Sequence, residues 1–339
     1  MAGTCGGETP YTERMSSDVR PAPDTDDEFR FLVSDAARVA RAAPLPEVRR
    51  ITVPVSDGRV LSGLAFDPAQ PPRLVVLHGA GLNAHSFDPV LLALDVPALA
   101  IDLPGHGRSD WRADADYRPD HLAIDIATAL ETLAPEPVVL LGHSLGGLTA
   151  ALVAAARPEL VRELVIVDIT PGVSPGGDAG AVAEFIGGQR DFGSIDEIVD
   201  RAVRFGIGSD RAALTRGVAL NTRRRPDGRL EWTHHFAHLD GISASDDPFP
   251  YAPVWGSLQS LELPITLVRA SAGMVSAALA AEWTAQLPAS TLVEVPGPHN
   301  LHEAAPTELA AVLRPPLGPD LGAGPARPSH DAPARVSGA

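Results

Sequence analysis

The sequence predicts an α/β fold in which a mostly parallel β-sheet carries helices on both faces. Short apolar runs at 73–78, 138–143 and 264–269 are typical of strands buried on both faces of such a sheet. Stretches with helical spacing of apolar residues lie between the predicted strands. The run 138–143 also breaks at a Gly-x-Ser-x-Gly pentad and resumes as an alanine-rich segment, which indicates a strand, a sharp turn and a helix.

The composition argues against several classes of function. The 339 residues carry a net charge of −16, and all 27 basic residues are arginine. Nucleic acids and anionic membranes require a basic surface, so we expect neither as a partner. The single cysteine, Cys5, cannot form an internal disulfide, and no run reaches the roughly 20 apolar residues of a membrane span. With no secretory signal at the start of the chain, we expect a cytoplasmic protein, and the oligomeric state stays open.

The first elements lead into the sheet. Residues 1–28 are rich in Gly, Thr, Pro and Asp and are predicted to be a disordered leader. Apolar residues at helical spacing predict a short helix within 29–43. The alternating segments 50–55 and 59–66 flank a Ser-Asp-Gly turn signal, which predicts a hairpin at an antiparallel edge.

Two further strands end in loops rich in glycine. The strand 73–78 runs into Gly79-Ala80-Gly81, where glycines leave backbone N–H groups free. The strand at 98–102 continues into a loop dense in Gly and Pro, in which we expect Asp102 and Ser109 to hydrogen-bond the turn. Residues 121–133 then show the apolar spacing of a helix.

The pentad at 142–146 places Ser144 where the strand must reverse into the helix. Its backbone is expected to be strained, and only glycines at 142 and 146 leave room for the chain to cross so closely. The helix that starts near Leu145 directs its free N–H groups and the positive end of its dipole at the same spot, which suits an oxyanion.

This pentad in its strand-turn-helix setting resembles the nucleophile elbow of the α/β-hydrolase superfamily, and 102–109 resembles the family's Asp-x-Pro-Gly-x-Gly-x-Ser segment. The resemblance covers about 51–313. It implies an α/β-hydrolase fold with a mostly parallel eight-stranded sheet and a helical cap inserted after the sixth strand. It also implies that Ser144 is a nucleophile and that the N–H groups of Ala80 and Leu145 form an oxyanion hole.

The pattern changes after the strand at 164–171, which carries Asp168 at its end. Glycine and proline punctuate short helical runs such as 195–205 and 211–220, which fits a cap that closes over the site and selects the substrate. The Pro-, Ala- and Gly-rich end is predicted to be a disordered tail. The predicted parts are thus a leader (1–28), a first core part (29–171), a cap (172–261), a second core part (262–314) and a tail (315–339).

Two features of the cap raise further hypotheses. His234, His235 and His238 include an i, i+4 pair, yet no Cys or Glu completes a metal-ligand set, so we expect no metal and no cofactor. Three consecutive arginines, 223–225, precede Pro-Asp-Gly and could hold an anionic substrate, although a solvated turn is the favoured interpretation.

The resemblance also implies a catalytic histidine after the last strand, at 291–295. His299 follows that strand and is our candidate, and His302 is its competitor. The family's usual acid follows the seventh strand, but 269–276 contain no carboxylate. Asp168 is therefore the predicted acid, with Asp102 as a weaker substitute and a Ser–His dyad as the other alternative.

These residues predict acyl transfer to water through an acyl-serine intermediate. Hydrolysis of a carboxylic ester, with a small-molecule acyl substrate, is the leading hypothesis. A thioesterase, a lactonase or a hydrolase of carbon–carbon bonds would use the same residues. A non-catalytic, hydrolase-like ligand-binding protein also stays open.

Overall fold

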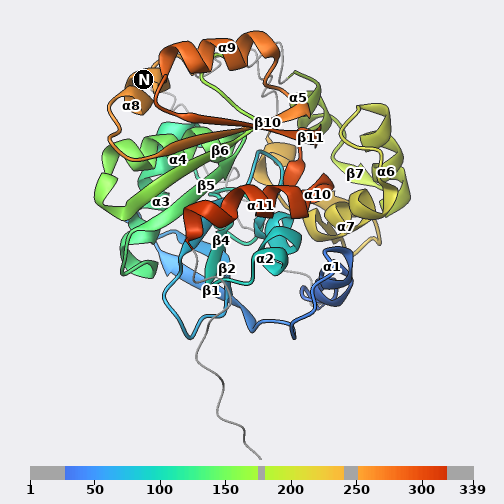
Figure 1. The fold of residues 1–339 in the computed structure, drawn as a ribbon. Coiled ribbons are helices and arrows are strands. Elements are labelled where there is room, and N and C mark those ends of the chain that lie inside the picture. Colours follow the sequence, from blue (N-terminus) through green and yellow to red (C-terminus); the bar gives the residue numbers. More distant parts are fainter. Residues whose placement is uncertain (1–26, 175–179, 240–250, 319–339) are drawn as a thin grey trace, which may run out of the picture.

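The computed structural model describes residues 27–174, 180–239 and 251–318. Its centre is an eight-stranded sheet in the order β1-β2-β4-β3-β5-β6-β10-β11 (Figure 1). The strands are β1 (Val48–Pro54), β2 (Val60–Phe66), β3 (Leu74–Leu77), β4 (Ala98–Ile101), β5 (Val138–His143), β6 (Val161–Val167), β10 (Ile265–Ala272) and β11 (Thr291–Pro298). β2 pairs antiparallel with β1 and with β4, and the remaining pairs are parallel. The predicted hairpin therefore forms the antiparallel edge.

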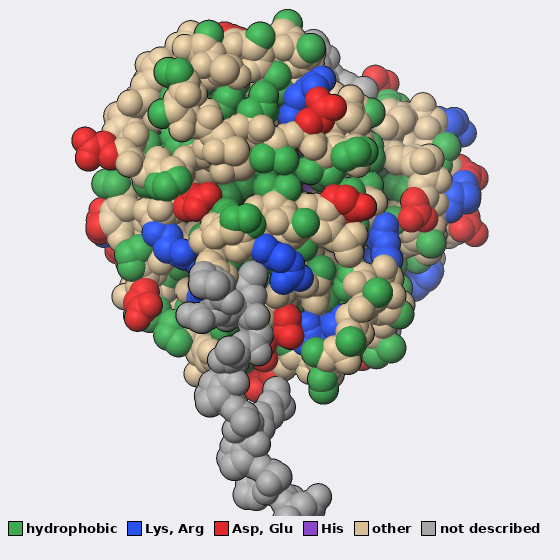
Figure 2. Space-filling model, in the orientation of Figure 1, with side chains coloured by type: hydrophobic (Ala, Val, Ile, Leu, Met, Phe, Trp, Pro, Cys, Tyr) green, Lys and Arg blue, Asp and Glu red, His purple; other side chains and the backbone are tan. Residues whose placement is uncertain are grey.

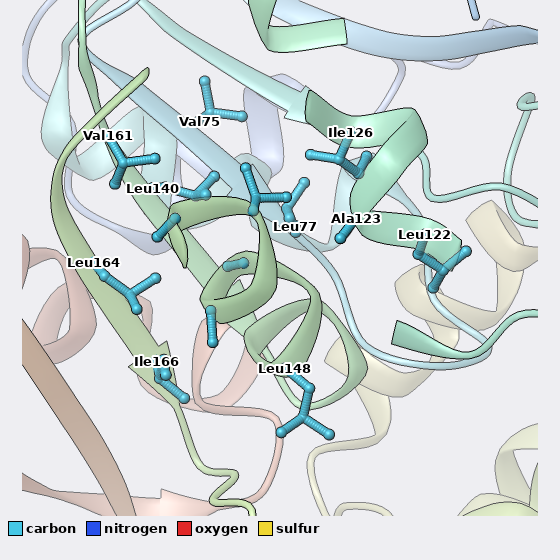
Figure 3. Close-up of a cluster of buried hydrophobic side chains, with 14 of the residues drawn as sticks. Val75, Leu77, Leu122, Ala123, Ile126, Leu140, Leu148, Val161, Leu164 and Ile166 are labelled. Carbon is cyan, nitrogen blue, oxygen red and sulfur yellow. The ribbon is translucent and has the colours of Figure 1, made fainter. Parts of the chain in front are cut away.

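Helices cover both faces of this sheet. One face packs against α3 (Pro119–Leu133), α4 (Leu145–Ala156), α8 (Val254–Gln259) and α9 (Ala277–Gln286), and the other against α1 (Leu32–Arg38), α2 (Asp88–Leu94), α10 (Leu301–Ala304) and α11 (Pro306–Leu317). β3 shows why both faces are apolar, because Val75 and Leu77 join the first cluster while Leu74 and Val76 join the second. Figure 3 shows the first cluster between the sheet and helices α3 and α4. Across the described ranges, no helix has the length and apolarity to cross a membrane.

The region between β6 and α8 lies beside the sheet (Figure 1). Its elements are α5 (Gly180–Gly187), β7 (Asp191–Phe192), α6 (Ile195–Arg204), α7 (Arg211–Asn221), β8 (Thr222–Arg224), β9 (Leu230–Trp232) and the 3-10 turn η3 (His235–His238). The strands form a second sheet in the order β7-β9-β8, which the sequence analysis did not predict. Strands of two or three residues are too short to show an alternating pattern. Around them packs a separate apolar cluster that includes Phe192, Val218 and Trp232.

A buried ion cluster joins this region to the core. Arg216 of α7 is 7% exposed, and its Nε donates to both carboxylate oxygens of Asp35 in α1, at 2.7 and 2.8 Å. Its Nη2 lies 3.0 Å from Asp88 Oδ2 in α2 and donates to the carbonyl of His85 at 2.9 Å. Both carboxylates thus pair with the same guanidinium, which fixes α7 against α1 and α2.

The predicted ends of the folded region need correction. Glu28, assigned to the leader, pairs with Arg50 of β1 at 2.5 Å, and the rest of the predicted leader up to residue 26 lies outside the described residues. The tail prediction at 315 falls inside α11, which continues to Leu317. Pro315 and Pro316 form part of the last turn of this helix. The buried side chain of Leu317 holds that turn against the sheet, and Gly318 ends the helix with a φ of 79°. Residues 319–339 lie outside the described part.

Candidate active site

Ser144 lies between β5 and α4 in a strained backbone conformation, with φ 52° and ψ −121°. Two glycines make this turn possible. A Cβ on Gly142 would lie 2.1 Å from the carbonyl oxygen of Gly146, and a Cβ on Gly146 would lie 2.5 Å from that of Leu77. The turn presents the serine hydroxyl at the carboxyl edge of the sheet, and within the described residues this hydroxyl makes no hydrogen bond.

The two predicted oxyanion donors are free to bind. Among the described residues, neither the N–H of Ala80 nor that of Leu145 donates a hydrogen bond. Leu145 is the first residue of α4, so its N–H belongs to the positive end of the helix dipole. His78 holds the segment before Ala80, because its Nδ1 donates to the carbonyl of Gly79 at 2.8 Å and its Nε2 accepts the N–H of Leu103 at 2.9 Å. Burial lowers the pKa of His78, which keeps this ring neutral.

Asp168 and His299 meet beside this turn. Nδ1 of His299 donates to Asp168 Oδ2 at 2.8 Å, and the carboxylate is fully buried. Since an ionised carboxylate only accepts, Nδ1 carries the proton and the lone pair of Nε2 is left for another donor. Asp168, which directly follows β6, has a φ of 51°.

The end of β10 and the loop that follows it hold this carboxylate through backbone N–H groups alone. Asp168 Oδ1 accepts the N–H of Ala270 at 3.0 Å and that of Val275 at 3.4 Å, and Oδ2 accepts the N–H of Met274 at 2.7 Å. A Cβ on Gly273 would lie 1.9 Å from Oδ2, so glycine is required there. The end of β10 and the loop after it thus supply backbone donors to a carboxylate that follows the neighbouring strand, β6.

The competing carboxylate, Asp102, has different partners. Its oxygens accept Nη1 of Arg50 at 2.6 Å and the N–H groups of Ala84 and Arg108 at 2.7 and 3.0 Å. Burial opposes its ionisation, but Arg50 and these N–H groups outweigh burial and lower the pKa of Asp102. Asp102 therefore stabilises the loop after β4, as the sequence analysis expected of it.

The competing histidine, His302, is completely buried in α10. Neither of its ring nitrogens has a hydrogen-bond partner in the described part of the chain. Burial, followed by the charge of His299, lowers the pKa of His302 to about 3. Such a ring has no access to a substrate.

A cavity of about 330 Å³ opens at Ser144 and His299. Part of its wall comes from the core, including Ala80, Leu82 and Met274. The remainder comes from apolar side chains of the region between β6 and α8, namely Phe185, Ile186, Phe205 and Ile207. Ile186 packs directly on Gly81, so this region covers the segment that carries one oxyanion donor.

The other singled-out residues have structural partners. His235 Nδ1 lies 2.6 Å from the hydroxyl of Tyr117, and Nε2 of His238 donates to the carbonyl of Trp232 at 2.9 Å. Within the described ranges, no group of three or more His, Cys, Asp or Glu could hold a metal ion. In the arginine run, Arg223 pairs with Glu231, and Arg225 lies 2.9 Å from Asp227.

Sequence reasoning missed the residues that hold the site together. His78 and Gly273 were assigned no role, and neither was His143, which lies inside the elbow pentad. The pentad fixes only its glycines and serine, so the pattern carries no signal for the position of His143. The role of Gly273 follows only from the folded structure, in which the backbone of 270–275 surrounds Asp168.

Comparisons with known proteins agree with one another. The model of the alpha/beta hydrolase family matches residues 74–312. Esterase Rv0045c of Mycobacterium tuberculosis is 38% identical over 257 residues, which cover 74% of this chain and 81% of that protein. Lipase LipV of the same organism is 30% identical over 75% of this chain and 96% of its own. The crystal structure of Rv0045c superposes with a TM-score of 0.73 at 35% identity, covering 87% of this chain and 99% of that one.

Proposed function

The chain belongs to the alpha/beta hydrolase family and is a carboxylic-ester hydrolase, and from this premise we propose that Ser144, His299 and Asp168 are its catalytic residues. One observation carries the assignment. The 2.8 Å bond from His299 Nδ1 to the buried Asp168 carboxylate lies at a cavity whose wall also contains the strained Ser144. A strained serine next to an imidazole with a free Nε2 is the arrangement that nucleophilic acyl transfer requires.

In the first half of the reaction, Ser144 Oγ attacks the ester carbonyl carbon while His299 Nε2 accepts the hydroxyl proton. The negative charge that develops on the carbonyl oxygen is stabilised by the N–H groups of Ala80 and Leu145. Asp168 stabilises the imidazolium and fixes its tautomer. When the C–O bond to the alcohol breaks, His299 returns the proton to the departing oxygen and the acyl group stays on Ser144.

The second half repeats these steps with water. His299 accepts a proton from water as the water oxygen attacks the acyl carbon, and the same two N–H groups hold the oxyanion. The bond to Ser144 Oγ then breaks, and His299 returns the proton to that oxygen. The net reaction consumes one ester and one water and releases an alcohol and an acid.

The substrate is a small-molecule ester, and we propose that one of its groups is apolar. Phe185, Phe205, Ile207 and Met274 line the cavity beside Ser144, and such walls favour a hydrocarbon group over a charged one. The face drawn in Figure 2 intersperses arginine with acidic side chains, which gives no basic surface there for a polyanion.

The decisive test is covalent labelling with a fluorophosphonate, together with hydrolysis of a short p-nitrophenyl ester. The parent protein should gain one phosphonate, and Ser144→Ala should lose both labelling and hydrolysis while keeping its melting temperature. Ser86→Ala is the matched control, because Ser86 Oγ is equally a serine hydroxyl without a partner in the described residues but does not line the cavity. A parent protein that is folded and unlabelled would instead support the non-catalytic ligand-binding alternative.

We further propose a cytoplasmic location. The single cysteine of the chain leaves the fold independent of an internal disulfide and hence of an oxidising compartment. Fractionation of the producing cells, followed by labelling of Ser144 in each fraction, tests this location.

A further inference from the structure

His143 is the last residue of β5 and directly precedes Ser144. Its side chain is 1% exposed. The ring lies between the segment that carries His299, the proposed general base, and the segment that leads to Ala80, the proposed oxyanion donor. On one side, its ring centroid is 4.5 Å from that of His299. On the other side, a Cβ on Gly79 would lie 2.7 Å from His143 Nδ1, which shows how closely the ring approaches the segment before Ala80.

A single hydrogen bond defines the state of this ring. Nε2 of His143 donates to the carbonyl oxygen of His299 at 3.1 Å. Because a carbonyl only accepts, Nε2 carries the proton and Nδ1, which has no partner among the described residues, is unprotonated. The same carbonyl accepts the N–H of Leu301 at 3.0 Å, so two donors fix the backbone at His299.

The ring must stay neutral during catalysis. In the proposed reaction His299 becomes positively charged, and a second charge 4.5 Å away would oppose this step. Burial, followed by the charges of His299 and His302, lowers the pKa of His143 well below its ordinary value. His143 therefore donates the same hydrogen bond before and after proton transfer to His299.

We propose that His143 is a positioning residue for ester hydrolysis, which clamps the backbone of His299 and the segment at Gly79 against the nucleophile turn. It keeps the general base and the oxyanion donor Ala80 aligned with Ser144 without touching the substrate. The inference rests on the proposed function. It differs from a packing role because it depends on the Nε2–H donor and not only on the volume of the ring.

Two substitutions at 143 separate these roles. His143→Leu keeps an apolar volume but removes the donor, and it should lower kcat by roughly 10- to 100-fold with KM within about threefold of the parent, since small displacements of reacting groups cost rates of this order. His143→Gln places an amide donor near the position of Nε2 and should recover most of kcat. Both variants should melt within a few degrees of the parent.

A second readout does not depend on turnover. The proton between His299 Nδ1 and Asp168 should give a low-field NMR signal in the parent and in His143→Gln. In His143→Leu this signal should broaden or shift, because the backbone of His299 loses one of its two donors. A residue that only fills space would leave the signal unchanged.

His302→Leu is the matched control. Its ring centroid is also 4.5 Å from that of His143, and it is completely buried, but it makes no hydrogen bond within the described residues. This variant should keep kcat within about twofold.

The proposal is overturned if His143→Leu retains the kcat and labelling rate of the parent. It is also overturned if His143→Gln and His143→Leu lose activity equally along with a fall in melting temperature, because that result assigns a packing role. Failure of the proposed function would look different, since the parent itself would then remain unlabelled at Ser144.

Discussion

The carboxyl ends of β4 and β6 place the same chemical group in similar surroundings. Asp102 and Asp168 each directly follow their strand and are at most 1% exposed. Each accepts backbone N–H groups from neighbouring loops. Each also packs against a glycine whose Cβ would strike the carboxylate, at 2.3 Å from Oδ1 for Gly107 and 1.9 Å from Oδ2 for Gly273.

The two ends differ in the cation that each carboxylate meets. Asp102 binds the guanidinium of Arg50, which carries a permanent positive charge and has no lone pair to accept a proton, whereas Asp168 binds the imidazole of His299, whose second ring nitrogen can accept one. The first pair can only stabilise a loop, while the second can respond to a proton that moves. Burial and backbone hydrogen bonds therefore do not distinguish these two carboxylates, whereas their side-chain partners do.

The largest expected effect is on the β6 side. Asp168→Asn keeps the shape of the side chain, but its amide favours the wrong tautomer of His299, so kcat for a p-nitrophenyl ester should fall by as much as about 10⁴-fold at neutral pH. The melting temperature should change far less. A folded Asp168→Asn variant with near-parental turnover would show that Asp168 differs from Asp102 in no catalytic respect, and it would point to a Ser–His dyad.

The matching change on the β4 side should affect stability. Asp102→Asn leaves the partly buried Arg50 with one fewer counter-charge, which should lower the free energy of unfolding by about 3 kcal/mol, measured by urea denaturation. Turnover per folded molecule should remain within a few-fold of the parent. If the variant instead loses activity while keeping its stability, Asp102 has a role in the chemistry.

A smaller effect is expected on the stability of the fold at acidic pH. The pKa of His302 is about 3 in the folded chain, below its ordinary value of 6.5. The unfolded chain therefore binds a proton between these values while the folded chain does not, so stability is lost as pH falls from 6.5 towards 3, by up to about 1.4 kcal/mol per pH unit. His302→Leu should make this loss shallower without abolishing it in denaturation curves measured between pH 7 and 5, because burial also lowers the pKa of His78 and of His143. An equal pH dependence in both proteins would place the acid-sensitive group elsewhere.

The smallest expected effect tests whether burial is the reason why the Arg50–Asp102 pair contributes strongly to the free energy of unfolding. Arg225 and Asp227 form a similar pair at 2.9 Å, but their side chains are 38% and 47% exposed. Asp227→Ala should change the free energy of unfolding by less than about 0.5 kcal/mol, because water solvates both groups. A loss as large as that of Asp102→Asn would show that pairing, and not burial, sets the cost.

Much of the fold was predictable because its strands and turns have strong local signals. The fold class and the ester-cleaving activity predicted from the sequence are confirmed by the family match and the related esterases. The runs at 138–143 and 264–269 correspond to β5 and β10, and the hairpin at 50–66 to β1 and β2. The helix predicted within 29–43 is shorter, because Ala40 has a φ of 51° soon after α1 ends at Arg38.

The site could be predicted less completely, because its geometry depends on contacts between distant segments. The absence of a carboxylate after β10 pointed to Asp168, and the structure brings Asp168 and His299 together, while their catalytic roles stay a proposal. Nothing local marks Gly273 or His143, which act through residues more than 100 positions away. The small sheet β7-β9-β8 escaped prediction because its strands are held by the apolar cluster around Trp232.

The way β10 holds Asp168 also affects how this enzyme can change over evolutionary time. The segment 270–275 holds the acid by backbone N–H groups, which every residue except proline supplies, so that only Gly273 is restricted to one residue type. Ala272 and Met274 line the cavity, but the side chains of these two residues do not take part in holding the carboxylate. We therefore expect single substitutions at these two positions to alter the range of accepted esters while the proposed catalytic acid stays in place, which makes this strand end a natural starting point for selection experiments.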